Sequence, residues 1–281
     1  MEETCYNLFI FGRERLKEVG ISNGARESKK ILAYVTNHEY SALNWMQEFK
    51  ISKELKFKFI TLIEQRVSGA PISKIIGKRL FFNSEFFVNE NVLDPRPETE
   101  VVVSVALEKN FSTVLDLGTG TGCIVISLLK ERPDVIGVSV DISKECLIVA
   151  KINAKTNGVL DRVEFTQSDW FSNVNSKFDL IVSNPPYIPS RSIRNLSKDI
   201  INYEPIIALD GGVDGLDLIK KVIYKANSLL KNRGLLALEI GNNQYQKVSN
   251  ILKKNGYRET GKEYDYKSNV RCIISTKVSF F

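Results

Sequence analysis

The chain has 281 residues, about twice the commonest domain size, so two domains are expected. With 43% hydrophobic and 26% charged residues, the composition excludes extensive disorder and suits a large apolar core. The single histidine, His38, argues against a His-rich metal site and against Ser-His-Asp hydrolysis. The net charge of +6 permits nucleic-acid binding, but no dense basic block indicates it.

The cysteines and the first residues indicate a cellular compartment. Cys5, Cys123, Cys146 and Cys272 are scattered without C-x-x-C spacing, which disfavours a zinc knuckle or a redox dithiol and suits reduced thiols. No apolar run is long enough for a membrane helix, and the acidic start is unlike a signal peptide. We therefore expect a soluble, cytoplasmic protein without a metal.

Residues 1–76 are predicted to form a small helical domain. Turns are expected near residues 20–24 and 37–41. Over 53–68 the apolar residues share one helical face, and these are Leu55, Phe59, Leu62, Ile63 and Val67. The domain contains no polar constellation typical of catalysis, so recognition or packing is its expected role.

Residues 77–93 are predicted to form a β-hairpin linker, because two aromatic-rich runs flank the pair Asn83 and Ser84. Four phenylalanines stand in these runs, namely Phe81, Phe82, Phe86 and Phe87. They form either a surface for a partner or core between two domains.

From residue 94 to 281 strands and helices alternate, which predicts an α/β domain with a doubly wound, mostly parallel sheet. The expected strands are 113–117, 135–140, 163–167, 178–183 and 235–240, and the expected helices are 122–132, 144–157, 216–230 and 244–254. The segments 258–263 and 270–276 are joined too closely for a helix, so we expect them to pair antiparallel at the sheet edge.

A glycine-rich turn follows the first of these strands and precedes a helix. The turn consists of Gly118, Thr119, Gly120, Thr121 and Gly122. Glycines let the backbone approach a ligand, and the helix start presents free N–H groups, so the turn predicts a nucleotide site. Asp141 ends the next strand, where its carboxylate can accept both ribose hydroxyls. Trp170, after the third strand, either borders an adenine ring or is an ordinary half-buried aromatic.

The fourth strand runs into Asn184, Pro185, Pro186 and Tyr187. The two prolines stiffen this loop, so the Asn184 side-chain oxygen and the Pro185 carbonyl become fixed acceptors beside an aromatic ring. Such a pocket suits a planar –NH2 group, either of an amide or of a base, stacked on Tyr187. No general base with a tuned pKa is evident near the loop, and none is needed if the proton leaves after the transfer.

Asn184–Tyr187, the glycine turn and Asp141 together resemble the S-adenosylmethionine (AdoMet)-dependent amino-methyltransferases. The sequence Arg-Pro-Glu-Thr-Glu at 96–100, the leading helical domain, Tyr203-Glu204-Pro205 and Ala208-Leu209 narrow the resemblance to release factor glutamine methyltransferases, the HemK or PrmC family. It covers essentially the whole chain. One departure is Asp94, where an apolar residue is expected before Pro95.

The resemblance implies a seven-stranded Rossmann-like methyltransferase sheet that uses AdoMet and yields S-adenosyl-L-homocysteine. The implied substrate is the glutamine of the Gly-Gly-Gln motif in class I peptide chain release factors, methylated on its side-chain N5 nitrogen. Residues 118–122 would line the methionine and ribose, Asp141 would bind the ribose, and Trp170 would lie near the adenine. Asn184, which would contact both cofactor and substrate, is expected to be catalytic together with Pro185 and Tyr187, and Pro186 would complete the substrate loop.

Other functions stay open from the residues alone. The first alternative is a methyltransferase that acts on a glutamine of a ribosomal protein, although the enzymes of that kind usually have a different sequence at the positions of residues 96–100. An adenine-N6 methyltransferase acting on a flipped base would use the same loop, but a basic stripe is missing. An NAD-dependent oxidoreductase leaves 184–187 without a role, and a non-catalytic nucleotide-binding module is the third class. We expect a monomer with no need for nucleic acid or membrane.

Overall fold

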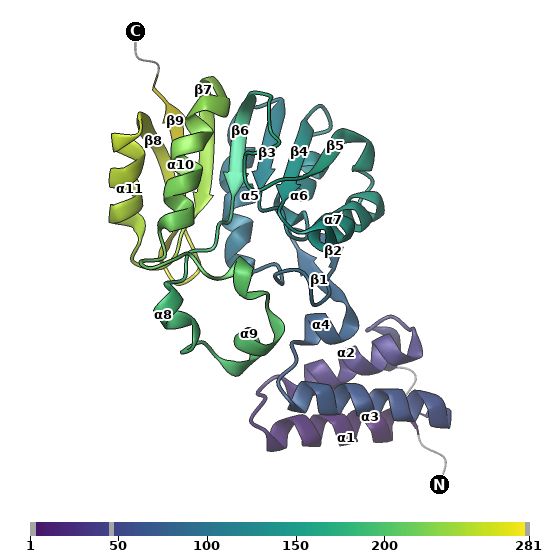
Figure 1. The fold of residues 1–281 in the computed structure, drawn as a ribbon. Coiled ribbons are helices and arrows are strands. Elements are labelled where there is room, and N and C mark those ends of the chain that lie inside the picture. The colour runs from purple at the N-terminus through teal and green to yellow at the C-terminus, as the bar shows by residue number, and fades with distance from the viewer. Residues whose placement is uncertain (1–3, 45–47, 279–281) are drawn as a thin grey trace. The chain divides into compact units, whose positions relative to one another are not determined.

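A computed structural model describes residues 4–44 and 48–278, and the chain forms two compact units. The first unit holds the chain up to Gly77 together with Ser197–Tyr203, and the second holds Lys78–Leu196 and the chain from Glu204 onward (Figure 1). Each unit has its own core.

The first unit is helical. Its helices are α1 (Cys5–Glu18), α2 (Gly24–Thr36), η1 (Ala42–Asn44), α3 (Lys53–Val67), α4 (Ile72–Ile76) and α9 (Lys198–Tyr203). The side chains of Thr4 and Ser52 accept hydrogen bonds from first-turn N–H groups, which begins α1 and α3. The predicted apolar face of α3 is confirmed: Phe59 and Ile63 are fully buried, and the other members pack around them.

Close helix packing in this unit depends on Gly12 of α1. A Cβ atom there would lie 2.8 Å from Phe59 Cζ and 2.9 Å from Ile63 Cδ1, and it would also collide with Ser28 Oγ. The Ser28 hydroxyl donates to the Phe9 carbonyl at 2.9 Å, so it has little freedom to move. Only glycine therefore lets α1, α2 and α3 approach this closely.

The second unit contains a seven-stranded sheet in the order β5-β4-β3-β6-β7-β9-β8. The strands are β3 (Thr113–Leu117), β4 (Ile136–Asp141), β5 (Val163–Gln167), β6 (Phe178–Ser183), β7 (Leu230–Glu239), β8 (Tyr257–Tyr264) and β9 (Val270–Lys277). The first five strands in the spatial order are parallel, and β9 is antiparallel to both of its neighbours. The predicted α/β fold with its antiparallel edge pair is confirmed. Strand β7 begins earlier than predicted, because Leu230 already pairs with Phe178 across a bulge.

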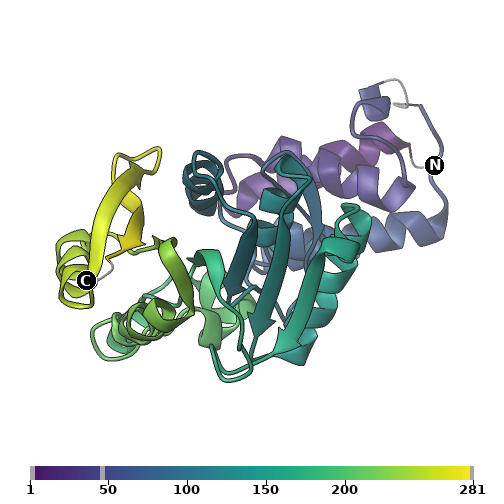
Figure 2. The ribbon, with the colours of Figure 1, turned by 90° about the horizontal axis from the view of Figure 1, so that it is seen from above.

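Helices cover both faces of the sheet (Figures 1 and 2). The helices of this unit are α5 (Glu100–Leu107), α6 (Cys123–Glu131), α7 (Lys144–Thr156), α8 (Ser190–Ile193), α10 (Asp217–Leu229) and α11 (Tyr245–Lys254), with short η2 (Pro97–Thr99), η3 (Leu160–Arg162) and η4 (Ile206–Ala208), and α8 lies beyond the end of the sheet (Figure 1). Side chains along β3 alternate, so that Val114 packs with α5 and α6 while Leu115 packs with α10 and α11. Each face of the sheet therefore has a separate apolar core. None of the helices in the described ranges is long and apolar enough to cross a membrane.

The hairpin of β1 (Lys78–Phe81) and β2 (Ser84–Phe87) belongs to this second unit. Phe81 and Phe86 are fully buried in the core that α5 and α6 share with the sheet. Phe82 packs against that core, and Phe87 is 39% exposed. Asn153 of α7 holds β2 in place, because its side chain accepts from the Phe87 N–H at 2.7 Å and donates to the Phe87 carbonyl at 3.0 Å. Phe81 and Phe86 are therefore core residues of the sheet unit itself.

The strand order reverses between β3 and β6. From β3 the chain proceeds to β4 and β5 on one side, and from β6 it proceeds to β7 on the other. At such a switch point the loops after neighbouring strands diverge and leave a crevice at the carboxyl ends of the strands. The loops that follow β3 and β6 are the glycine turn and Asn184–Tyr187.

Candidate functional site

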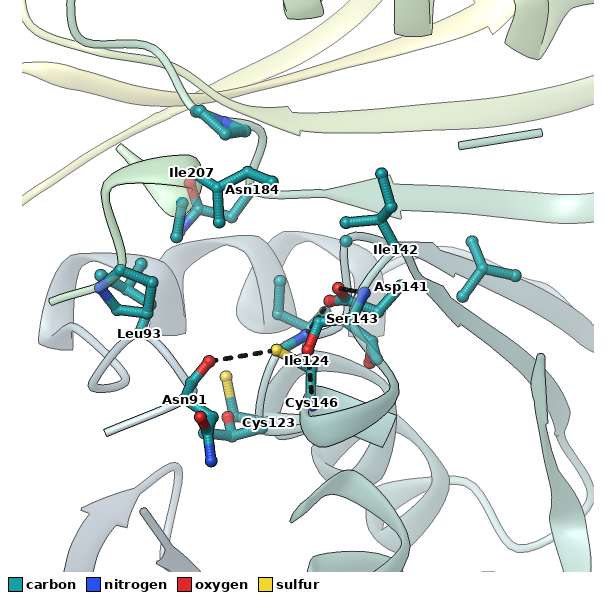
Figure 3. Close-up of a pocket in the computed structure, with 18 of the residues that line it drawn as sticks. Asn91, Leu93, Cys123, Ile124, Asp141, Ile142, Ser143, Cys146, Asn184 and Ile207 are labelled. Carbon is teal, nitrogen blue, oxygen red and sulfur yellow. Dashed lines mark hydrogen bonds between the residues drawn. The ribbon is translucent and has the colours of Figure 1, made fainter. Parts of the chain in front are cut away.

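A cavity of about 520 Å³ lies at this crevice (Figure 3). Of the residues predicted to bind cofactor or substrate, it is lined by Gly118, Thr119, Gly120, Thr121, Asp141, Trp170, Asn184 and Pro186. Its other walls include Arg96, Thr99, Cys123, Ser143, Cys146, Pro205, Ile207 and Lys221. Figure 3 shows Asn184 and Ile207 on one side of the cavity and Asp141 and Ser143 on another. The volume suits a nucleotide-sized ligand.

The glycine turn borders the cavity with left-handed backbone. Gly118 and Gly120 have φ angles of 69° and 54°, and no atom lies within 4 Å of the place where a Cβ would stand. Gly122 has a different role, because it precedes α6 and a Cβ there would lie 2.7 Å from Ile126 Cδ1. It is also absent from the described residues that line the cavity. Gly122 therefore serves packing, and its cofactor role stays a prediction, whereas Gly118 and Gly120 leave the backbone open to a ligand.

Asp141 ties the glycine turn to the start of α7. Its Oδ2 accepts from the Gly120 N–H at 2.9 Å, and its Oδ1 accepts from the Ser143 N–H at 3.0 Å. Burial raises the pKa of Asp141, whereas the hydrogen bonds from Ser143 and Gly120 lower it. Each carboxylate oxygen has a second lone pair, so Asp141 can also accept from ligand hydroxyls.

Trp170 borders the cavity in an unusual backbone conformation. Its φ angle is 55°, which costs a non-glycine residue about 1–3 kcal/mol and is typical of functional sites. Its ring packs against the core under α10 and α11. Next to it, Asp169 forms an ion pair with Lys221 of α10 at 3.0 Å. These contacts hold the aromatic ring at the cavity wall.

The loop after β6 presents Asn184 to the same cavity. The Asn184 Nδ2 donates to the Thr99 hydroxyl at 3.2 Å. Pro185 is buried, and neither it nor Tyr187 is among the described residues that line the cavity. The Tyr187 ring packs against the core under α10 and α11, and its hydroxyl donates to Glu239 Oε1 at 3.3 Å. A stacking role for Tyr187 stays a prediction.

Glu239, the last residue of β7, escaped the sequence analysis. It is 1% exposed, and burial raises its pKa to about 7, although Thr99, Arg271 and Tyr187 all lower it. A buried carboxyl group with a raised pKa therefore lies behind the loop, whereas the expectation that no general base acts at the loop stays a prediction. Its position at the carboxyl end of a parallel strand, where ligand sites form, was the available signal.

Gln244 at the start of α11 anchors the loop from behind. Its Nε2 donates to the carbonyls of Tyr187 and Gly215 at 3.0 and 3.1 Å, and its Oε1 accepts from the Gly241 N–H at 2.8 Å. All three contacts are to backbone, so they hold the path of the chain whatever the neighbouring side chains are. The sequence contained no local signal for this residue.

Asp94, the residue that departs from the family pattern, lies next to charged side chains. It is 3% exposed and lies 3.5 Å from the Arg79 guanidinium. Its N–H donates to Glu204, whose other oxygen accepts from Arg96 at 2.6 Å. This network joins the segment at 94–96 to Glu204, directly before the cavity-lining residue Pro205.

The donor and acceptor set fits AdoMet. A half-buried carboxylate for the ribose hydroxyls, an open glycine backbone and an aromatic wall surround one cavity. Among the residues described, no group of three or more His, Cys, Asp or Glu side chains is placed to hold a metal ion.

Comparison with known families agrees with this geometry. Residues 7–77 match the PrmC N-terminal domain, and residues 91–203 match the methyltransferase small domain. By structure, the chain resembles a methyltransferase from Pyrococcus furiosus, with a TM-score of 0.55 and 17% identity over 77% of this chain and 98% of that chain. The catalytic domain of hMettl16 also has a TM-score of 0.55, at 15% identity over 82% of this chain and 83% of that chain. These likenesses confirm the fold.

Relatives identify the family. A release factor glutamine methyltransferase of Cereibacter sphaeroides is 39% identical over 86% of this chain and 87% of the relative. Proteins of the same name from Agrobacterium fabrum and Caulobacter vibrioides are 34% and 36% identical, over 94% and 99% of this chain and 94% and 98% of theirs. The chain is therefore a methyltransferase and belongs to the release factor glutamine methyltransferase family.

Proposed function

We propose that the protein transfers the methyl group of AdoMet to the side-chain N5 nitrogen of the glutamine in the Gly-Gly-Gln motif of class I peptide chain release factors. The observation that carries this proposal is the single cavity at the switch point. It joins a nucleotide-type half, with Gly118, Gly120 and Asp141, to a half that presents Asn184. The names of the relatives supply the substrate class.

In this proposal the cofactor half of the cavity holds AdoMet through its backbone and Asp141. Gly118 to Thr121 line the methionine and ribose, Asp141 accepts hydrogen bonds from the ribose hydroxyls, and Trp170 borders the adenine. AdoMet, when bound, supplies an electrophilic methyl group on sulfur and becomes S-adenosyl-L-homocysteine. Because Asp141 already holds the N–H groups of Gly120 and Ser143, it acts from a fixed position.

The acceptor half holds the glutamine amide. The nitrogen of an amide is a poor nucleophile, since its lone pair is delocalised into the carbonyl group. The Asn184 Oδ1 and the Pro185 carbonyl would accept both N–H bonds, aim the nitrogen at the methyl group and stabilise the positive charge that develops on it. A nitrogen–carbon bond forms as the sulfur–methyl bond breaks, and one amide proton is then released to solvent.

A docking role for the helical unit is part of the proposal. None of its described residues lines the cavity, and it has a core of its own. A relative's name points to a large protein substrate rather than a small molecule. We therefore assign the helical unit to holding the body of the release factor.

The direct test is mass spectrometry of a purified class I release factor after incubation with the enzyme and AdoMet. We expect one added methyl group on the Gly-Gly-Gln glutamine. Asn184→Ala should lower the rate by about 100-fold or more, as loss of one transition-state hydrogen-bonding group does elsewhere. Asn195→Ala, which changes an exposed asparagine in the following segment, is the matched control and should leave the rate unchanged.

Parallel reactions with ribosomal protein, DNA and RNA separate this function from its alternatives. Methylation of one of these in place of the release factor would refute the substrate assignment while keeping the enzyme class. The cytoplasmic location and the monomeric state stay predictions, and fractionation and sedimentation of the purified protein test them.

A further inference from the structure

The methyl acceptor requires one particular end of the Asn184 side chain. A carboxamide has an oxygen that only accepts and a nitrogen that only donates. An incoming amide nitrogen carries hydrogens, so the Asn184 oxygen must face it. What sets that orientation is the hydrogen-bond partner on the other end of the carboxamide.

That partner is the Thr99 hydroxyl, which lies 3.2 Å from the Asn184 Nδ2. Thr99 ends η2 and is 3% exposed, so little water reaches its hydroxyl. A hydroxyl has one hydrogen to donate. When it accepts from Asn184, its own hydrogen must point to a different acceptor.

The candidate acceptor is Glu239. Its Oε1 accepts from the Tyr187 hydroxyl, whereas its Oε2 is buried without a hydrogen bond of good geometry among the described residues. Thr99 lowers the pKa of this carboxyl group, which indicates that its hydroxyl lies close to the carboxylate. An ionised carboxylate can only accept, so it draws the Thr99 hydrogen and leaves the Thr99 lone pair to Asn184.

We propose that Thr99, oriented by the Glu239 carboxylate, is the positioning residue that turns the amide oxygen of Asn184 toward the methyl acceptor. The assignment rests on the proposed function of Asn184. Neither Thr99 nor Glu239 needs to touch the reacting atoms. Together they set the direction of a hydrogen-bond chain that runs from β7 through η2 to the loop after β6.

The charge of Glu239 makes the direction of this chain dependent on pH. The groups that influence it are Thr99 and Glu98 on η2, Tyr187 after β6, Arg271 and Cys272 on β9, and Cys123 on α6. Burial raises the pKa of Glu239 to about 7, and Arg271 opposes that rise. Above this pKa the carboxylate only accepts. Below it the protonated group can donate to Thr99, which then can donate to Asn184 and favour the inverted amide.

Kinetics of release-factor methylation test the proposal. We expect Thr99→Val, which keeps the shape of the side chain, to lower kcat by about 10- to 100-fold, as small misplacements of reacting groups do. AdoMet affinity measured by calorimetry should fall far less than kcat. Thr99→Ser keeps a hydroxyl and should restore kcat. The kcat of the unchanged enzyme should fall as the pH drops below the pKa of Glu239, and Glu239→Gln should remove that acid limb.

Thr113→Val is the matched control, because it removes a hydroxyl that donates to Asp179 at 2.8 Å near the opposite end of the sheet. It should change the unfolding midpoint but not kcat. Full kcat in folded Thr99→Val, or equal losses in Thr99→Ser and Thr99→Val, would overturn the proposal. Should Thr99→Val not fold, the Thr99→Ser rate and the pH profile of Glu239→Gln decide the question.

A second readout does not depend on the substrate. In protein labelled with ¹⁵N-asparagine, the side-chain signals of Asn184 are identified by their absence in Asn184→Ala. We expect these signals to shift between pH values below and above the pKa of Glu239, and not to shift in Glu239→Gln. Failure of the enzyme to methylate any release factor would refute the proposed function, whereas Asn184 signals insensitive to both Thr99→Val and Glu239→Gln would refute the positioning role.

Discussion

At the residue scale, the half-buried carboxylate of Asp141 and the fully buried carboxylate of Asp116 differ in how their oxygens are satisfied. Both oxygens of Asp141 accept backbone N–H groups, and the residue also borders the cavity. Asp116, at 1% exposed, accepts from the Thr119 hydroxyl at 2.7 Å, and its Oδ1 has no hydrogen-bond partner among the described residues. The first arrangement suits a ligand-binding anion. The second suits a group that holds its proton over a wide pH range.

Asp141→Ala should weaken AdoMet binding by about 10- to 100-fold, since hydrogen bonds to a charged group contribute about 1.5–3 kcal/mol. Isothermal calorimetry measures this directly. The control is Asp161→Ala, which removes an exposed carboxylate from η3. Unchanged affinity in Asp141→Ala would contradict the ribose role.

Asp116 should make stability depend on pH. Burial raises its pKa from 3.8 to about 7, so the folded state keeps a proton that the unfolded state has lost. Between these values the free energy of unfolding therefore decreases as the pH rises, and it levels off above about 7. Glu239 acts in the same direction over an overlapping range. In Asp116→Asn this decrease should be smaller, as urea unfolding across the range would measure, and an unaltered slope would contradict the expectation.

At the scale of elements, single side chains fasten the site-bearing loops to helices. Asn153 of α7 donates to the Thr121 carbonyl at 2.9 Å while it also holds β2. Gln244 of α11 holds the backbone after Asn184. Both loops of the site are therefore fixed from outside the cavity, which favours a preorganised geometry.

Gln244→Leu should test that anchoring. It leaves the carbonyls of Tyr187 and Gly215 and the Gly241 N–H without their partner, and each unsatisfied buried group costs about 1–3 kcal/mol. We expect a lower free energy of unfolding together with reduced kcat and nearly unchanged AdoMet affinity. Gln246→Leu changes an exposed residue of the same helix and should alter neither quantity. Normal kcat in Gln244→Leu would show that the loop holds its path unaided.

At the scale of the whole molecule, the chain builds two units with separate cores. The helical unit receives Ser197–Tyr203 from the middle of the second unit's sequence, so the backbone passes between the units three times, after Gly77, Leu196 and Tyr203. Its core centres on Phe59 and Ile63. A substitution that destabilises this core should therefore lower the rate of methyl transfer mainly by weakening the docking of a large substrate.

Gly12→Ala should destabilise the core of the helical unit, because its Cβ would lie within 3 Å of Phe59 and Ile63. We expect a lower unfolding midpoint for the helical unit, at a cost of about 1–3 kcal/mol for overpacking. The kcat/KM for whole release factor should fall more than that for a short Gly-Gly-Gln peptide. Ala25→Ser, at an exposed position of α2, is the control. Equal losses on both substrates would argue against a docking role.

The sequence by itself determined the order and kind of the strands and of helices α6, α7, α10 and α11 in the sheet unit, but not helix α5. Strands of buried β-branched residues alternate with amphipathic helices, and both patterns are local, so β3, β5 and β6 have the predicted bounds. The glycine turn, Asp141 and Asn184 were found for the same reason. Each directly follows a strand, and the carboxyl ends of parallel strands meet at one edge of a sheet.

Only the tertiary structure decided which distant residues meet behind the site. Thr99, Glu239 and Gln244 come from η2, β7 and α11, and their contacts with Asn184 and Tyr187 depend on strand order, register and helix packing. No local pattern encodes such contacts. The same holds for Phe81 and Phe86, whose burial depends on the hairpin docking against the sheet unit. Length and composition predicted two domains, but the assignment of Ser197–Tyr203 to the helical unit required the packed chain.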